Sequence, residues 1–261
     1  MERYITVNNH RMRYIDEGSG SHVILVHGLG GSASSWANNI PYLARDHHVL
    51  AVDMLGFGRS DKPRIDYTID LFVDMLKGFM DALAVDKASM IGSSLGGQIV
   101  AEYALRHPGM VDRLVLVAPA GFTPRAFKGT STLLNYTRIF DARSREGLRS
   151  LLERVHGKIS EEYIEWMYEY IRMENARHAF LSALRNSAKA ERLGRRFRRA
   201  LESGMKVMVV WGKDDRIIPV KYAEQFIDMP NCRLLLLENC GHRPHVEASS
   251  VFNEYVRIFL Q

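Results

Sequence analysis

The chain has 261 residues, of which 46% are hydrophobic and 25% charged, and its formal net charge is +5. This composition excludes disordered, collagen-like and coiled-coil proteins, and no apolar run approaches the roughly 20 residues that a membrane-spanning helix needs. The N-terminus lacks the apolar stretch of a signal peptide, so we expect a cytoplasmic protein.

The basic excess is confined to one segment. Residues 122–204 hold 17 Lys and Arg against 10 Asp and Glu, whereas the rest of the chain holds 18 against 20. The surplus is therefore a property of this segment, and the net charge does not indicate a nucleic-acid partner.

Apolar runs alternate with amphipathic stretches along most of the chain. Strands are predicted at 5–7, 13–16, 22–26, 49–52, 88–91, 114–117, 207–211 and 233–237, and helices at 34–45, 69–83, 95–106, 220–227 and 249–260. Because strands that alternate with helices are joined by right-handed crossovers, this order predicts an α/β protein with a mostly parallel eight-stranded sheet and flanking helices. Asn8 and Asn9 predict a short turn and an antiparallel start.

One region breaks this alternation. Residues 123–203 show only helical periodicity, as at 161–172 and 176–190, and no convincing strand. We interpret them as a helical insertion after the sixth strand. The core domain is then expected at 1–121 and 205–261, and the insertion at 122–204. The insertion contains several large apolar side chains at helical spacing, which we expect to pack against one another rather than to line an acyl pocket. They are Trp166, Met167, Tyr170, Met173 and Phe180.

A serine motif follows the fifth predicted strand. Gly92, Ser94 and Gly96 form the pattern G-x-S-x-G between that strand and the next predicted helix. A nucleophile on such a turn adopts a strained backbone, so its neighbours two positions away must be small. The helix N-terminus also points at any oxyanion formed there. Ser94 is the predicted nucleophile, and a glycine-rich junction that binds phosphate is the alternative.

A serine hydroxyl needs a base and an orienting acid to act as a nucleophile. Among the ten histidines, His27 and His242 stand just after predicted strands. His242 lies on a loop at the carboxyl end of its strand, where the sites of parallel sheets assemble, and it is the predicted base. Asp214 and Asp215 both follow the strand at 207–211, so either carboxylate can be the acid.

The segment HGLGG at residues 27–31 follows the third predicted strand. Its glycines allow the backbone to approach a substrate, and we predict that the backbone amides of Leu29 and Leu95 form an oxyanion hole. The alternative is a tight turn without a chemical role.

Neither a metal nor a cofactor is expected. The chain contains no HExxH, CxxC, Walker or GxGxxG pattern. Cys232 and Cys240 flank a predicted strand, whose length separates them beyond the reach of a disulfide, so both are expected to be free thiols in a reducing compartment.

Taken in order, these motifs resemble those of the α/β-hydrolase superfamily along the whole chain. HGLG at 27–30, DMLGFGRS at 53–60, GSSLG at 92–96, GKDDRIIP at 212–219 and GH at 241–242 carry the resemblance. It implies the α/β-hydrolase fold, with the insertion as a helical lid. The family's acid stands three residues after the glycine, so the implied catalytic triad is Ser94, Asp215 and His242.

Within the superfamily, Ser94 excludes the branches that use aspartate as nucleophile. The chain resembles bacterial carboxylesterases and monoacylglycerol lipases. It also resembles meta-cleavage-product hydrolases, which break carbon–carbon bonds and tend to have Asn and an aromatic residue where this chain has Ser93 and Arg243. The predicted function is hydrolysis of carboxylic esters, with short- to medium-chain acyl groups or monoglycerides, through an acyl-enzyme. Carbon–carbon hydrolysis of vinylogous 1,5-diketones is the alternative, and a hydrolase-fold ligand receptor is the third.

The expected partner is a small-molecule ester. Five arginines of the lid are expected to form a solvated helix face, with weak contact between the basic lid and a lipid interface as the alternative. They are Arg192, Arg195, Arg196, Arg198 and Arg199.

Overall fold

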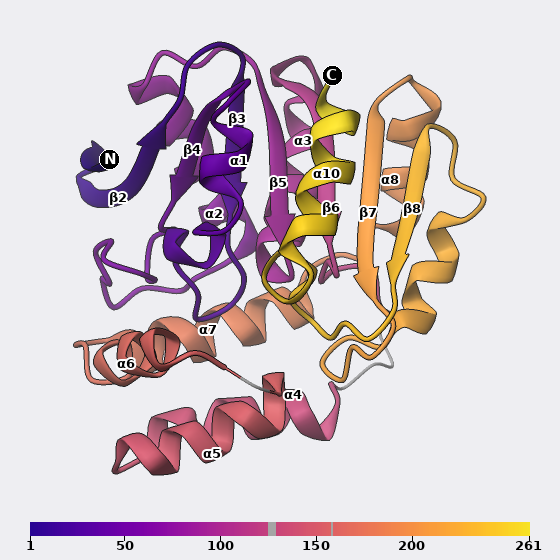
Figure 1. The fold of residues 1–261 in the computed structure, drawn as a ribbon. Helices are drawn as coiled ribbons and strands as arrows, with labels where there is room; N and C mark the ends of the chain where they lie inside the picture. Colours follow the sequence, from indigo (N-terminus) through magenta and orange to yellow (C-terminus); the bar gives the residue numbers. More distant parts are fainter. Residues whose placement is uncertain (125–128, 158) are drawn as a thin grey trace.

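An eight-stranded sheet runs through the computed structural model, which describes residues 1–124, 129–157 and 159–261 (Figure 1). Its strands are β1 (Glu2–Val7), β2 (His10–Glu17), β3 (His22–Val26), β4 (His48–Val52), β5 (Ala88–Ser93), β6 (Val111–Val117), β7 (Lys206–Gly212) and β8 (Cys232–Leu237). Their order is β1-β2-β4-β3-β5-β6-β7-β8, in which β2 is antiparallel to both neighbours and the other pairs are parallel. The predicted α/β class and mostly parallel sheet are confirmed.

The antiparallel start depends on a two-residue turn between β1 and β2. Asn8 and Asn9 have φ angles of 49° and 65°, and Val7 pairs with His10 across the turn. A type I′ hairpin turn requires positive φ at both central residues, which asparagine tolerates better than most residues. The predicted hairpin is confirmed.

Helices cover both faces of the sheet (Figure 1). One face carries α2 (Ile69–Ala82), α3 (Leu95–Arg106) and α8 (Gly194–Glu202), and the other carries α1 (Ile40–Leu43) and α10 (Ser249–Leu260). The short helices are η1 (Ala33–Trp36), η2 (Pro108–Met110), η4 (Val220–Phe226) and α9 (Pro244–Glu247). Among the helices that the structure describes, none is both long and apolar enough to cross a membrane.

Two of the predicted helices differ in the structure. The helix expected at 34–45 is wrong, because the chain forms η1 and then the separate short helix α1. Pro41 lies in the first turn of α1, the position where its missing N–H costs nothing, whereas a continuous helix would place it in the interior. The segment at 220–227 is the 3₁₀ helix η4, in which Val220, Ala223 and Phe226 recur every three residues, the period of that helix.

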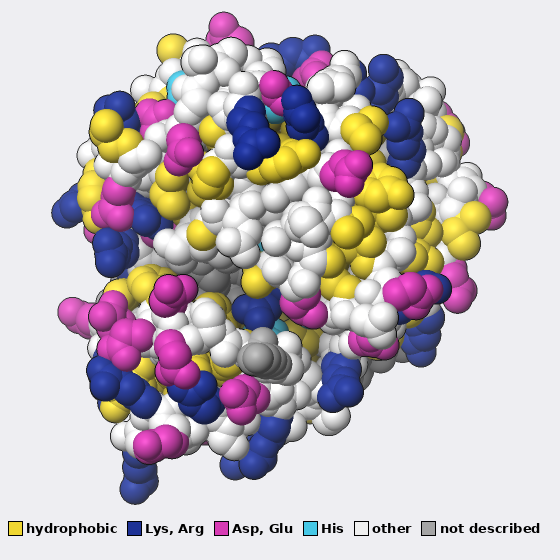
Figure 2. All heavy atoms as spheres, viewed as in Figure 1, with side chains coloured by type: hydrophobic (Ala, Val, Ile, Leu, Met, Phe, Trp, Pro, Cys, Tyr) yellow, Lys and Arg dark blue, Asp and Glu magenta, His cyan; other side chains and the backbone are white. Residues whose placement is uncertain are grey.

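Between β6 and β7 the described residues form helices joined by short loops, and no strand. These helices are α4 (Ser131–Tyr136), η3 (Thr137–Asp141), α5 (Arg145–His156), α6 (Glu161–Tyr170), α7 (Ala176–Lys189) and α8. Helices α4 to α7 form a layer below the carboxyl ends of the parallel strands in Figure 1, and Figure 2 shows the surface hollowed between this layer and the sheet. The lid role and the domain division at 122–204 stay predictions.

Apolar packing holds this layer together. Met167, Tyr170 and Phe180 are fully buried, as predicted. Hydrogen bonds then attach α7 to the core: the Tyr67 amide donates to the Ser182 hydroxyl at 3.0 Å, and the Asn175 side chain donates to the Lys62 carbonyl at 3.0 Å. The layer therefore has a defined position over the strand ends.

The arginines of α8 do more than face solvent. Arg196 donates to both carboxylate oxygens of the buried Glu102 of α3, each at 2.9 Å, and Arg106 donates to the same carboxylate at 2.8 Å. Arg195 and Arg199 are exposed. The prediction of a solvated face is therefore wrong for Arg196, because this side chain docks α8 on the core. Lipid contact stays a prediction.

We expect Glu102→Gln to lower the free energy of unfolding by about 1–2 kcal/mol at neutral pH, because two guanidinium groups lose the negative charge and one of the two acceptor oxygens that they share. Burial opposes ionisation of Glu102, but hydrogen bonds from Arg196 and Arg106 outweigh it and lower its pKa below the ordinary 4.5. A carboxyl with a lowered folded-state pKa contributes stability above its unfolded pKa and loses it as the pH falls through the folded value. Urea unfolding between about pH 7 and about pH 3 should show the deficit shrinking toward acid pH.

Asp112→Asn is the matched control for this experiment. Asp112 pairs with Lys87 at 3.3 Å, and both side chains are at least half exposed. Removing such a surface pair should change stability by less than about 0.5 kcal/mol at any pH. An equal loss in the two variants would contradict the docking role of Glu102.

The two cysteines are free thiols, as predicted. Burial raises the pKa of Cys232 and of Cys240 to about 12. Both groups therefore stay protonated at neutral pH, where a thiol is a poor nucleophile.

Candidate active site

Ser94 occupies the turn between β5 and α3. Its φ and ψ angles are 54° and −115°, a combination that costs an L-residue about 1–3 kcal/mol unless the surroundings enforce it. Two backbone hydrogen bonds enforce it here: the Ser94 amide donates to the Val117 carbonyl at 2.8 Å, and the Ala120 amide donates to the Ser94 carbonyl at 3.0 Å. The side chain is thereby held above the end of the sheet.

The glycines on either side of Ser94 are sterically required. A β-carbon on Gly92 would lie 2.3 Å from the Gly96 carbonyl oxygen, and one on Gly96 would lie 2.3 Å from the Val26 carbonyl oxygen. Both distances are far below van der Waals contact. The expectation of small neighbours two positions from the serine is confirmed.

Asp215 and His242 are hydrogen-bonded to each other. Nδ1 of His242 lies 2.7 Å from Oδ2 of the buried Asp215, and the Trp211 indole donates to the same oxygen at 3.1 Å. The other oxygen, Oδ1, accepts the backbone amides of Ile217 and Ile218 at 2.8 and 2.9 Å. This carboxylate is therefore fully occupied as an acceptor and cannot rotate freely.

Asp214 and Asp215, which the residues alone left as alternative candidates for the acid, lie in different environments in the structure. The Asp214 side chain is exposed, and its backbone amide donates to the Cys240 carbonyl at 2.9 Å. A β-carbon on Gly212 would lie 2.2 Å from the carbonyl oxygens of both Cys240 and Gly241. The loops that carry the acid and the imidazole thus pack backbone against backbone, and this contact directs Asp215 to His242.

His27, the other histidine that follows a strand, is held by the backbone. It is almost completely buried, its Nε2 accepts the Met54 amide at 3.1 Å, and its Nδ1 lies 2.7 Å from the Gly28 carbonyl oxygen. Because an amide can only donate, Nε2 carries no proton and Nδ1 donates to the carbonyl. Burial also lowers the pKa of His27. This residue therefore orients the turn that follows it.

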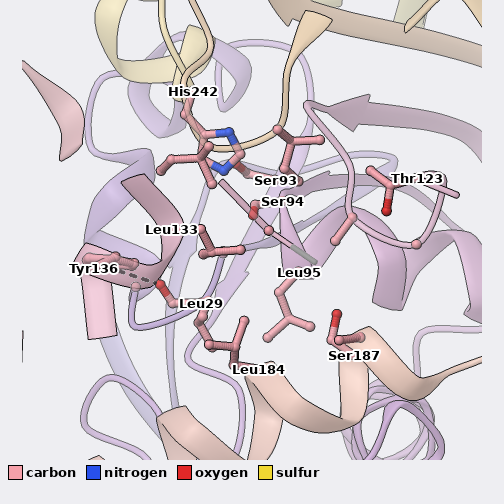
Figure 3. Close-up of a pocket in the computed structure, with 18 of the residues that line it drawn as sticks. Leu29, Ser93, Ser94, Leu95, Thr123, Leu133, Tyr136, Leu184, Ser187 and His242 are labelled. Atoms are coloured by element: carbon pink, nitrogen blue, oxygen red, sulfur yellow. Dashed lines mark hydrogen bonds between the residues drawn. The ribbon is translucent and has the colours of Figure 1, made fainter. Parts of the chain in front are cut away.

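That turn passes close to the serine. A β-carbon on Gly28 would lie 3.2 Å from the β-carbon of Ser94, and the Tyr136 hydroxyl donates to the Leu29 carbonyl at 3.3 Å (Figure 3). Within the described part of the chain, the amides of Leu29 and Leu95 donate to no protein acceptor. Both residues line the same cavity as Ser94. Their role as an oxyanion hole stays a prediction.

The cavity has a volume of about 530 Å³ and lies between the loops at the strand ends and the helical layer. Figure 3 shows the His242 ring pointing toward Ser94 inside it. Its apolar lining includes Leu29, Leu95, Leu133, Tyr136, Leu184, Ile217 and Ile218. Its cationic lining consists of Arg185, Lys189, Arg192 and Arg243, and no described Asp or Glu lines it. A cavity with this lining favours an apolar ligand with a negative charge.

Sequence reasoning did not identify several residues of this wall. Tyr136, His156 and Tyr163 come from three helices of the insertion, and none of them belongs to a recognisable motif. Arg243 was noted only as a departure from a family pattern. None of the large insertion residues expected to pack internally lines the cavity.

Comparison with known proteins gives one family. A family model described as alpha/beta hydrolase fold matches residues 21–249. A 2-hydroxy-6-oxo-6-(2'-aminophenyl)hexa-2,4-dienoic acid hydrolase from Metapseudomonas resinovorans is 32% identical over 268 aligned residues, which cover all of this chain and 91% of that protein.

Solved structures agree with this match. A mutant of the meta-cleavage product hydrolase from Pseudomonas fluorescens IP01 superposes with a TM-score of 0.84 at 27% identity, covering 99% of this chain and 97% of that one. A membrane phospholipase A, described as a bacterial virulence factor, also reaches a TM-score of 0.84, at 26% identity, covering 100% of this chain and 85% of that one.

Proposed function

This chain belongs to the alpha/beta hydrolase family, and from that premise we propose that it cleaves a carbon–carbon bond in meta-cleavage products. These substrates are vinylogous 1,5-diketones that carry a carboxylate. The protein is a hydrolase of the alpha/beta fold. The sequence motifs favoured ester hydrolysis, with carbon–carbon hydrolysis as the alternative, and the names of the relatives support the alternative.

One observation carries this choice of substrate. The cavity beside Ser94 and His242 is lined by four cationic side chains and by no described carboxylate. A carboxylate-bearing dienoate gains from that field, whereas a neutral ester does not. The apolar remainder of the lining suits the conjugated chain and an aryl group.

In the proposed first step, Ser94 attacks the ketone carbonyl and His242 takes the hydroxyl proton. Asp215 holds Nδ1 of the imidazole, so that the second ring nitrogen faces the serine as a base. The amides of Leu29 and Leu95 stabilise the tetrahedral oxyanion, each by about 3 kcal/mol.

Collapse of this intermediate breaks the bond between the carbonyl carbon and its neighbour. The electron pair is delocalised through the neighbouring carbon–carbon double bond into the second carbonyl, and His242 passes its proton to the enolate oxygen formed there, which becomes the 2-hydroxyl group of the product. Water then hydrolyses the acyl-enzyme, releasing a carboxylic acid and restoring the Ser94 hydroxyl. One water is consumed, and the two products are an acid and a 2-hydroxydienoate.

Ester hydrolysis remains the second candidate. The structural likeness to a phospholipase A and the leucine-rich wall of the cavity support it. The same three side chains serve an ester, because His242 would then protonate the departing alkoxide oxygen instead of an enolate.

The two candidates differ in which substrate is turned over faster. We expect the kcat/KM for a yellow ring-cleavage dienoate, followed by its bleaching, to exceed that for p-nitrophenyl esters of any acyl length by at least about tenfold. Faster turnover of esters would favour the second candidate. If neither substrate reacts while a fluorophosphonate still labels Ser94, the result favours a ligand receptor on this fold.

A further inference from the structure

A polar cluster that the proposed mechanism does not use lies beside His242. It consists of Arg243, Tyr163 and His156, which all line the cavity. They come from the loop after β8, from α6 and from the end of α5. Two consecutive helices of the insertion and a loop about 80 residues further along the chain therefore place polar groups on one wall.

Arg243 is a half-buried cation without an ionic partner. Its guanidinium carbon lies 4.8 Å from the centre of the Tyr163 ring, and its Nε is buried with no described residue to accept its hydrogen bond. Glu247, on the following helix, uses its oxygens for the backbone amides of Gly241 and of Arg243 at 2.7 and 2.9 Å. No described carboxylate forms an ion pair with this guanidinium. Charges removed from water normally find a partner.

His156 completes the cluster as a neutral group. Its ring packs edge-on against Tyr136 and Tyr163, with ring centres 5.2 and 6.1 Å apart. Both ring nitrogens are buried, and neither has a hydrogen-bond partner among the described residues. Burial, with smaller contributions from Arg243 and His242, holds the pKa of His156 well below its usual range. At neutral pH the ring is therefore uncharged, and Arg243 supplies the charge of the cluster.

We propose that Arg243 binds the carboxylate of the substrate in a subsite completed by Tyr163 and His156. This inference rests on the proposed function and names the group that recognises its anionic substrate. A planar guanidinium matches a carboxylate with two parallel hydrogen bonds. Arg243 lines the cavity next to the imidazole and has no ionic partner among the described residues, and a ligand carboxylate would supply one. Arg243 is in this way a specificity-determining residue.

The other cations of the cavity are less suited to this role. Arg185 and Lys189 are exposed, so water competes for their charges, and Arg192 donates to the Ala188 carbonyl at 3.0 Å. Ion pairs in solvent contribute little, whereas a partly desolvated charged hydrogen bond contributes roughly 10- to 100-fold in affinity.

The test compares an anionic with a neutral substrate in three variants. For each protein the ratio of kcat/KM for the dienoate to that for p-nitrophenyl acetate is measured. We expect Arg243→Gln to lower this ratio by at least about tenfold through a higher KM for the dienoate, and Arg243→Lys to recover part of it. Arg195→Gln, which removes an exposed cation that does not line the cavity, should leave the ratio within about threefold.

Failure of this inference can be told apart from failure of the proposed function. If the wild-type protein does not cleave the dienoate, the dienoate is used as an inhibitor of ester turnover, and Arg243→Gln should raise its inhibition constant by at least about tenfold. Equal losses on both substrates, an unchanged inhibition constant, or a larger effect of Arg195→Gln would each overturn the role of Arg243.

Discussion

Replacing Ser94 by alanine is expected to lower kcat by roughly 10⁴- to 10⁶-fold, the largest effect of any single substitution in this chain. The substitution removes only the hydroxyl group, so the covalent acyl-enzyme cannot form. What remains is water attack assisted by the oxyanion hole and by binding. Single-turnover assays on the preferred substrate measure the loss, and fluorophosphonate labelling of Ser94 should disappear with it.

Ser93→Ala provides the matched control for this experiment. Ser93 is the preceding residue, also lines the cavity and also carries a hydroxyl, but it stands on β5 rather than on the turn. Its loss should change kcat by less than about tenfold, because it makes no covalent bond. Thermal unfolding should show that both variants are folded. A Ser94→Ala protein with more than a few per cent of the activity would refute its role as nucleophile.

Asp215→Asn is expected to lower kcat by roughly 10³- to 10⁴-fold. All four groups that face this carboxylate are donors: the imidazole Nδ1, the indole of Trp211 and the amides of Ile217 and Ile218. His242 and Trp211 share one carboxylate oxygen, and the two isoleucine amides share the other. The NH₂ group of an asparagine must therefore face one of these two pairs of donors. If it faces His242, the ring accepts at Nδ1 and carries its proton on Nε2, so it cannot take the proton of Ser94.

The other orientation of the asparagine has a different signature. Its NH₂ group then faces the amides of Ile217 and Ile218, which leaves donors opposed and should lower the free energy of unfolding by about 1–3 kcal/mol. Activity and urea unfolding are therefore measured together. Asp214→Asn, the exposed neighbour, should leave both within experimental error. If Asp214→Asn lowered kcat as much as Asp215→Asn, the assignment of Asp215 as the acid would be excluded.

Local signals in the sequence were sufficient for most of the sheet and for the turn at Ser94. Apolar runs and turn residues act within a few positions of one another, and the strand at 22–26 and the helix at 95–106 agree with β3 and α3. The helix at 34–45 failed because the amphipathic period continues through Pro41, where the backbone cannot. The apolar residues at 220–227 recur every three positions, so the sequence itself indicates the 3₁₀ type of the helix that forms there.

The sequence by itself determined the α/β sheet, the strained turn at Ser94 and the strand ends that carry His242 and the two aspartates, since each depends on neighbours along the chain. Only the tertiary structure decided that Asp215 faces His242, that His27 binds the backbone, and that Arg243 meets Tyr163 and His156 over a cavity. Such contacts join residues from 27 to about 80 positions apart, and their geometry follows from how the loops and the helical layer pack on the sheet. No local pattern encodes that packing.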